Sequence, residues 1–417
     1  MRVLIVTAGS WGDVAPYTGL AVRLREAGHA VDLATHARFA DAVTGHGIGF
    51  RPLPVDPREE LASATGQGLA RAVSPAVAMA RAVTMARRFM PRLTRGIADA
   101  VAQGADVLIS STVTDPMCTV LAEAHRIPSL SGYLQPVTPT RAFPPLVTAA
   151  RTLGGYGNLL ASRALWAGTD GLFAPAVRAL RHELGLPAPR RGTSRGAFTG
   201  FLGLPPTRTV LHGFSPTVVP RPADWPEGHE VCGYWWPPAP PGWEPEPRLA
   251  EFLAAGPPPV FAGFGSFVAG DAERLSALLV KAFRLAGVRG VVQSGWSGLH
   301  AEGDDVLTIG EAPHAALFPR MAAVVHHAGA GTTSAGLRAG VPAVPVPVQL
   351  DQHFWAARLH TLGVAPRPLR YQRLEAAELA GAIRAALAVP PVRPRALAAA
   401  LAAEDGSAPV RTALARL

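Results

Sequence analysis

Short apolar runs alternate with longer amphipathic segments along the first half of the chain. Apolar runs bounded by turn residues are typical of buried strands, and apolar residues spaced three and four apart are typical of helices. The predicted strands are residues 2–7, 30–35, 106–111 and 127–133, and the predicted helices are residues 16–27, 74–100, 115–125 and 146–184, with a short one ending at Val43. Strands that alternate with helices form βαβ units, so this half predicts a parallel sheet.

Prolines and tryptophans interrupt this pattern and predict a stiff linker at 221–247, after a first domain at 1–220. A second alternating series follows, with strands at residues 259–265, 290–293, 306–309, 322–326 and 342–348, and helices at 272–286, 315–321, 331–339, 352–362 and 374–387. It predicts a second domain at 248–395 and a helical tail at 396–417. The predicted fold class is α/β, with two doubly wound Rossmann-like domains that face a cleft and bind ligand at the carboxyl ends of their strands.

The stretch from Val324 to Leu337 carries the clearest functional signal, because a buried strand runs into a glycine-rich turn that opens a helix. A helix N-terminus exposes unpaired N–H groups, and glycines let a phosphate approach the backbone. His327 lies where its side chain can donate to the same phosphate. The next strand ends at Asp351 and Gln352, which adds two polar side chains. A phosphate cradle beside groups that bind sugar hydroxyls is what a nucleotide-sugar site requires.

A second polar loop follows the first strand and contains Ser10 and Asp13. Asp13 is a candidate general base. Its position is also explained if it caps a helix that begins near Pro16. The loop lacks the Gly-x-Gly-x-x-Gly spacing of a dinucleotide fingerprint, and the chain has no Gly-Lys-Ser/Thr phosphate loop.

Three weaker signals occur in the second domain. Ser266 follows the strand at 259–265 and its glycine turn. A tight turn explains this motif as well as a Ser266 hydroxyl that donates a hydrogen bond to the diphosphate from a second side. Trp296 ends the next strand and either stacks on a base or seals the core. His314 lies where a nucleobase is expected.

Composition narrows the class of protein. Hydrophobic residues make up 48% and charged residues 17%, which indicates a globular chain, and no apolar run is long enough to span a bilayer. Two cysteines, Cys118 and Cys232, argue against a disulfide scaffold and a zinc site and suit a reducing cytoplasm. The net charge of +9 comes almost wholly from arginine, without the aromatic interleaving or module of a nucleic-acid binder.

The segment 67–98 holds six arginines and no acidic residue. A solvated helix face and a face that touches a membrane surface both explain it.

Together these motifs resemble the GT-B-fold, family-1-type nucleotide-sugar glycosyltransferases, especially bacterial natural-product and sterol-type members. The resemblance is most specific from His326 to Gly363 and is modest at the Gly9, Gly263, Gln293 and Ala312 segments. It implies an inverting, metal-independent enzyme with no cofactor, whose co-substrate is a UDP- or dTDP-linked sugar. It also implies a hydrophobic small-molecule acceptor held by the first domain, and a C-terminal helix that crosses back to that domain. We expect a monomer or homodimer.

The resemblance also assigns roles. His327 is expected to bind the donor phosphate beside the anomeric carbon, and Asp13 to deprotonate the acceptor, with Ser10 nearby. The residues expected to bind the rest of the donor are Gly329, Gly331, Thr332 and Ser266 for the diphosphate, Asp351 and Gln352 for the sugar, and Trp296 and the strip from Ala312 to His314 for the base.

This chain departs from the family pattern in three respects. Ala328 stands where many members have glycine, and Glu311 stands near where plant members stack a tryptophan on the base. The catalytic histidine that plant members carry in the first loop is absent, which leaves Asp13 to take that role. Three alternatives remain open from the sequence: a membrane-lipid glycosyltransferase, a nucleotide-sugar epimerase of the same fold, and a donor-binding helper protein without catalysis.

Overall fold

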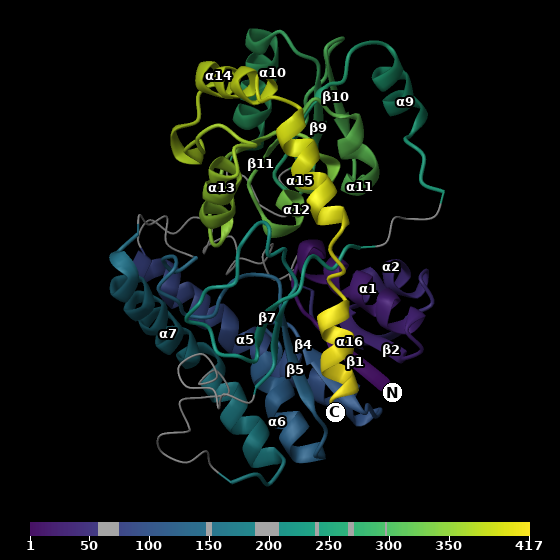
Figure 1. Ribbon diagram of the computed structural model, residues 1–417, viewed down its shortest axis with the longest axis vertical. Coiled ribbons are helices and arrows are strands. Elements are labelled where there is room, and N and C mark those ends of the chain that lie inside the picture. The colour runs from purple at the N-terminus through teal and green to yellow at the C-terminus, as the bar shows by residue number, and fades with distance from the viewer. Residues whose placement is uncertain (57–74, 147–151, 188–207, 238–241, 266–270, 297) are drawn as a thin grey trace.

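The computed structural model describes residues 1–56, 75–146, 152–187, 208–237, 242–265, 271–296 and 298–417, and the statements below concern these residues. Figure 1 shows two α/β domains stacked along the long axis of the molecule, each built around its own sheet. All strand pairs in both sheets are parallel. The predicted fold class is confirmed.

The first domain contains a seven-stranded sheet with the order β3-β2-β1-β4-β5-β6-β7. Its strands are β1 (Arg2–Val6), β2 (Ala30–His36), β3 (Gly49–Leu53), β4 (Val107–Ser110), β5 (Ser129–Tyr133), β6 (Val210–His212) and β7 (His229–Val231). Its helices are α1 (Trp11–Glu26), η1 (Ala37–Phe39), α2 (Ala40–Thr44), α5 (Pro75–Ala102), α6 (Asp115–His125) and α7 (Gly154–Glu183). The strand order reverses between β1 and β4, and such a switch point is where an open α/β sheet places its ligand.

Three of these strands do not follow from the sequence pattern. β3 contains Arg51 and Pro52, which suit only an edge strand, and the Arg51 guanidinium pairs with Asp32 on β2. β6 and β7 are too short to show a period, and β7 falls inside the expected linker.

The second domain contains a five-stranded sheet with the order β10-β9-β8-β11-β12. Its strands are β8 (Val260–Gly263), β9 (Gly290–Gln293), β10 (Val306–Ile309), β11 (Ala323–His326) and β12 (Ala343–Pro345). Its helices are α9 (Pro247–Ala254), α10 (Ala272–Ala286), α11 (His314–Leu317), η2 (Phe318–Arg320), α12 (Ala330–Ala339), α13 (Gln352–Thr361), η3 (Tyr371–Arg373) and α14 (Ala376–Leu387). The switch point lies between β8 and β11, at the start of the glycine-rich turn.

The C-terminal tail joins the two domains. α15 (Val392–Ala402) lies on the second domain beside α12, and α16 (Ala408–Ala415) lies on the first domain (Figure 1). Val410 and Leu414 of α16 share one core cluster with Ile5 of β1. The return of the C-terminal helix to the first domain is therefore confirmed.

Candidate active site

The first polar loop folds back on itself around the Asp13 carboxylate. The carboxylate Oδ2 of Asp13 accepts hydrogen bonds from the Ser10 backbone N–H at 2.8 Å and from the Ser10 hydroxyl at 3.0 Å. Ser10 is the N-cap of α1 and Asp13 its third residue, so the pair forms a capping box. The helix therefore begins at Trp11, and the predicted start at Pro16 is wrong, because Ser10 and Asp13 cap the backbone five residues earlier.

Asp13 combines the two roles that the sequence left open. Its Oδ2 caps α1, while Oδ1 accepts no hydrogen bond from the described residues and the side chain is half-buried at the cleft. Burial raises the pKa of the Asp13 carboxyl, and the hydrogen bonds from Ser10 oppose the rise only partly. A carboxylate with a raised pKa and an oxygen without a protein partner is suited to accept a proton.

Gly9 and His36 hold this loop in place. The Nε2 atom of His36 accepts the Gly9 backbone N–H at 2.9 Å, while Nδ1 lies 2.6 Å from the Val55 carbonyl oxygen. Both contacts are satisfied together only by a neutral ring that donates from Nδ1. Gly9 has φ of +150°, and a Cβ there would overlap the Asp13 carboxylate. The buried His36 thus positions the loop that carries Ser10 and Asp13, a role that sequence reasoning missed.

The glycine-rich turn after β11 opens α12, with Gly329 as the N-cap. The preceding residue, Ala328, has φ of +61°, a left-handed conformation that costs a residue with a Cβ about 1–2 kcal/mol. The buried ring of His326 supports the turn, because its Nδ1 accepts the Ala328 backbone N–H at 3.1 Å. His326 is therefore part of the turn's support rather than a ligand-binding group.

His327 lies between the two glycine turns of the second domain. A Cβ on Gly329 would lie 2.5 Å from its Nε2 atom, and a Cβ on Gly265 would lie 3.0 Å from its Cε1 atom. The glycines of both motifs therefore leave room for this imidazole. Burial lowers the pKa of His327 to about 4, and a backbone interaction with Gly263 opposes the shift. The ring is neutral at pH 7 and carries one N–H to donate.

The loops of the two domains meet at the cleft. The first turn of α1 faces the first turn of α12 so closely that a Cβ on Gly331 would lie 3.6 Å from the Cα atom of Gly12. Thr332, next along α12, is half-buried beside this contact. The structure therefore brings the predicted base and the predicted phosphate loop to one place.

Asp351 and Gln352 lie at the start of α13, where Asp351 is the N-cap residue. The Asp351 carboxylate accepts the Trp355 indole N–H at 2.8 Å, and burial, together with the charge of Asp13, raises its pKa to about 6. The side-chain oxygen of Gln352 accepts the backbone N–H groups of Val348 and Gln349 at 2.8 and 2.9 Å. Gln352 thus retains only its amide N–H groups for a ligand.

The residues expected near the nucleobase lie on neighbouring strand ends. Trp296 is half-buried, and the Arg38 guanidinium from the first domain lies over its ring, 5.6 Å from the centroid. The half-buried Ala312 packs against the core of the second domain. His314 stacks on Phe318 with ring centroids 4.4 Å apart, so one face of its ring is already covered. Arg38 is a cleft residue that sequence reasoning missed.

Some of the predicted residues and segments lie wholly or partly outside the described part of the chain. Ser266 lies outside them, as do residues 67–74 of the basic segment. From residue 89 onward, the apolar residues of α5 face the core, and Arg92 donates to the Pro54 carbonyl at 2.9 Å.

Within the described part of the chain, no helix is long and apolar enough to cross a membrane, and no three His, Cys, Asp or Glu side chains form a metal-binding group.

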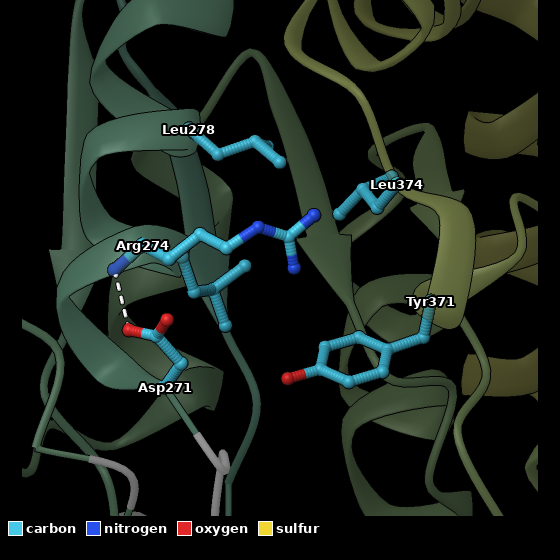
Figure 2. A pocket seen from close by; sticks show the side chains of 6 residues that line it. Asp271, Arg274, Leu278, Tyr371 and Leu374 are labelled. Carbon is cyan, nitrogen blue, oxygen red and sulfur yellow. Dashed lines mark hydrogen bonds between the residues drawn. The ribbon is translucent and has the colours of Figure 1, made fainter.

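A small pocket of about 220 Å³ lies elsewhere on the second domain (Figure 2). Tyr371 and Arg274 face each other across it, and Asp271 caps α10 by accepting the Arg274 backbone N–H at 2.9 Å. None of the predicted site residues lines this pocket.

Comparison with known proteins identifies the family. Residues 3–144 match the glycosyltransferase family 28 N-terminal domain, and residues 292–416 match the erythromycin biosynthesis protein CIII-like C-terminal domain. The chain is 35% identical to the O-mycaminosyltylonolide 6-deoxyallosyltransferase of Streptomyces fradiae, over 97% of this chain and 95% of that protein. It is 32% identical to a sterol 3-beta-glucosyltransferase of Arabidopsis thaliana, over 92% of this chain and 60% of that longer protein.

Solved structures show the same fold. The glycotransferase of kitacinnamycin superposes with a TM-score of 0.71 at 20% identity, over 100% of this chain and 98% of that one. The glycosyltransferase SnogD from Streptomyces nogalater superposes with a TM-score of 0.63 at 20% identity, over 100% and 99%. The chain belongs to the GT-B nucleotide-sugar glycosyltransferases of the macrolide and sterol type, and it is an enzyme of that class.

Proposed function

We propose that this enzyme transfers a sugar from a UDP- or dTDP-linked donor to a hydroxyl of a hydrophobic small molecule, with inversion and without a metal ion. The observation that carries the proposal is the meeting of Asp13 with the phosphate loop and Asp351 in one cleft. A base, a diphosphate cradle and a sugar-binding carboxylate are the three parts that the reaction needs.

In this proposal, Asp13 deprotonates the acceptor hydroxyl. An alcohol has a pKa far above neutral, so its proton must leave as the new bond to the anomeric carbon forms. Oδ1 of Asp13 takes that proton, while Ser10 keeps the carboxylate in position through Oδ2. The bond from the anomeric carbon to the diphosphate breaks on the opposite face, which inverts the configuration.

The leaving diphosphate gathers negative charge as this bond breaks. The N-terminus of α12 offers backbone N–H groups at Gly331 and Thr332, and these are already oriented before the reaction begins. His327 donates its single N–H to the phosphate beside the anomeric carbon. Asp351 accepts hydrogen bonds from sugar hydroxyls, and the Gln352 amide donates to them.

The acceptor side of the cleft exposes apolar surface. Trp11 at the start of α1 is 45% exposed, and Val113 after β4 is 37% exposed. Both follow strands whose carboxyl ends face the cleft, where an acceptor would be held. Relatives named for macrolide and sterol acceptors fit an apolar substrate at this position.

The proposal is tested in two measurements. Thermal-shift titrations with UDP, dTDP, GDP, ADP and NAD identify the donor base, and His327→Ala should weaken the stabilisation by the nucleotide that binds. Transfer assays with that donor and an acceptor panel should then show that Asp13→Asn lowers turnover by about a hundredfold or more and leaves nucleotide binding intact. Unchanged turnover in Asp13→Asn would rule out Asp13 as the base, and stabilisation by NAD alone would refute the donor assignment.

A lipid-borne acceptor is a second candidate, favoured by the surface of α7. Leu153, Tyr156 and Leu160 are 57%, 70% and 63% exposed on one face of its first turns, and the Arg141 guanidinium covers the Tyr156 ring at 4.3 Å. Apolar residues beside arginines suit a membrane surface. Sedimentation with anionic vesicles, compared between wild type and Leu153→Ser/Leu160→Ser, tests it. Equal sedimentation of both proteins, or of neither, would exclude this face as a membrane contact.

A further inference from the structure

A second cavity lies at the hinge between the domains. Its volume is about 720 Å³, within the range of small-molecule sites. The last turns of α1, the segment 234–237 and the turn 404–407 form its walls, together with Arg338 from the end of α12. The two peptide segments are the places where the chain passes between the domains (Figure 1). Since α1 rises 1.5 Å per residue, its wall lies about 15 Å from Asp13.

Arg338 is a partly exposed residue on the wall of this hinge pocket. Its guanidinium lies over the Trp236 ring, 4.7 Å from the centroid. No carboxylate among the described residues pairs with it, whereas Arg23 pairs with Glu26 and Arg411 with Asp405. Partial burial lowers the pKa of Arg338, and the nearby positive charge of Arg23 lowers it further. Glu26, Glu404 and Asp405 also line the pocket; Glu26 and Asp405 pair with Arg23 and Arg411, which leaves the Arg338 guanidinium to attract an added anion.

The geometry of Arg338 suits an anion with a flat body. A guanidinium that stacks by its face keeps its N–H donors free at its edge, where they can bind a carboxylate, sulfonate or phosphate through two hydrogen bonds. Trp236 and Pro237 supply half-buried apolar surface on the same wall. We propose that the hinge pocket is a second ligand site, which binds a flat organic anion against Arg338 and Trp236.

The pocket is also connected to the active site. α1 carries Asp13 at one end and Arg23 at the other, and α12 runs from the phosphate loop to Arg338. The two helices contact each other. An anion bound to Arg338 beside the end of α1 is therefore linked through these two helices to the Ser10–Asp13 loop and the phosphate loop, and we expect it to change the affinity for nucleotide.

The test uses the fluorescent anion 1-anilinonaphthalene-8-sulfonate with the full-length protein. A saturating nucleoside diphosphate is present to exclude the dye from the donor half of the cleft, and dye bound on the acceptor side is distinguished because Arg338→Ala does not affect it. We expect a saturable site in the wild type whose affinity falls about tenfold in Arg338→Ala, because a charge-assisted hydrogen-bonded pair is lost. Trp236→Leu should weaken it too. Arg320→Ala, which removes an exposed arginine outside the pocket, should bind as the wild type does.

Three results would overturn the site: dye binding that the nucleotide abolishes, binding unchanged in Arg338→Ala, or an equal loss in Arg320→Ala. Arg338→Gln replaces Arg338→Ala if the alanine variant does not fold, as judged by its melting temperature. For the coupling, calorimetric titration of nucleotide with and without dye is compared between wild type and Arg338→Ala. A dye effect of the same size in both proteins would overturn the coupling, because it would arise in the cleft.

Discussion

Asp13 and Asp351 come from different domains, and the negative charge of Asp13 contributes, after burial, to raising the pKa of the Asp351 carboxyl to about 6. The charge of Asp13 therefore opposes the ionisation of Asp351. In the proposed mechanism one carboxylate receives the acceptor proton and the other binds the sugar, so both must be ionised.

The first prediction concerns the pH dependence of donor binding. Affinity for the nucleotide sugar should fall as the pH drops through about 6, because Asp351 becomes protonated. In Asp13→Asn the neighbouring negative charge is gone, so the pKa of Asp351 falls and the loss of affinity moves to lower pH. Titrations of donor at several pH values measure both curves. Superimposable curves would show that the two carboxylates do not interact.

The second prediction concerns Gly9, whose missing side chain leaves space for the Asp13 carboxylate. Gly9→Ala should reduce turnover about as strongly as Asp13→Asn, by about a hundredfold, because it displaces the base. Gly28→Ala is the matched control, since Gly28 also has positive φ but no atom within 4 Å of an added Cβ. It should cost stability through backbone strain and leave turnover near the wild-type value. Normal turnover in Gly9→Ala would contradict the packing argument.

The third prediction concerns the strained turn at Ala328. Ala328→Gly removes the cost of a left-handed alanine, although the unfolded chain gains freedom, so we expect a net gain of up to about 1 kcal/mol in the free energy of unfolding. Ala335→Gly, within α12, should instead lose about 1 kcal/mol. Urea denaturation measures both. A loss of stability in Ala328→Gly would show that the turn is not strained.

The fourth prediction concerns acid stability. Burial lowers the pKa of several histidines to between about 3 and 4, and they are His212, His229, His314, His326 and His327. Each is neutral in the folded state and protonates near pH 6.5 when unfolded. Their contribution is thus complete above pH 6.5 and is lost as the pH falls toward 4, by up to about 1.4 kcal/mol per pH unit for each histidine.

Thermal melts between pH 4 and pH 8 measure this loss. His326→Asn serves as the comparison, because asparagine can still accept the Ala328 backbone N–H but does not titrate. The variant should lose stability less steeply than the wild type below pH 6.5. An equal slope in both proteins would mean that His326 does not contribute.

Much of the architecture is determined by local sequence. The apolar runs at β1, β4, β8 and β11 are buried on both faces, so their pattern alone predicts parallel strands. The phosphate turn is equally local, because a strand, a glycine run and a helix follow one another between Ala323 and Ala339. The resemblance to the family is carried by the same local motifs.

Only the tertiary structure decided how these parts act together. Gly12 contacts Gly331, and Asp13 affects Asp351, although each pair is more than 300 positions apart in the sequence. The local periodicity of the sequence contains no information about such distant pairs. The supporting roles of His36 and His326 were hidden for the same reason, since a buried histidine looks like any core residue until its partner is known. Sequence determines which elements form, because helices and strands depend on near neighbours. The packing of two domains decides which side chains share a cleft.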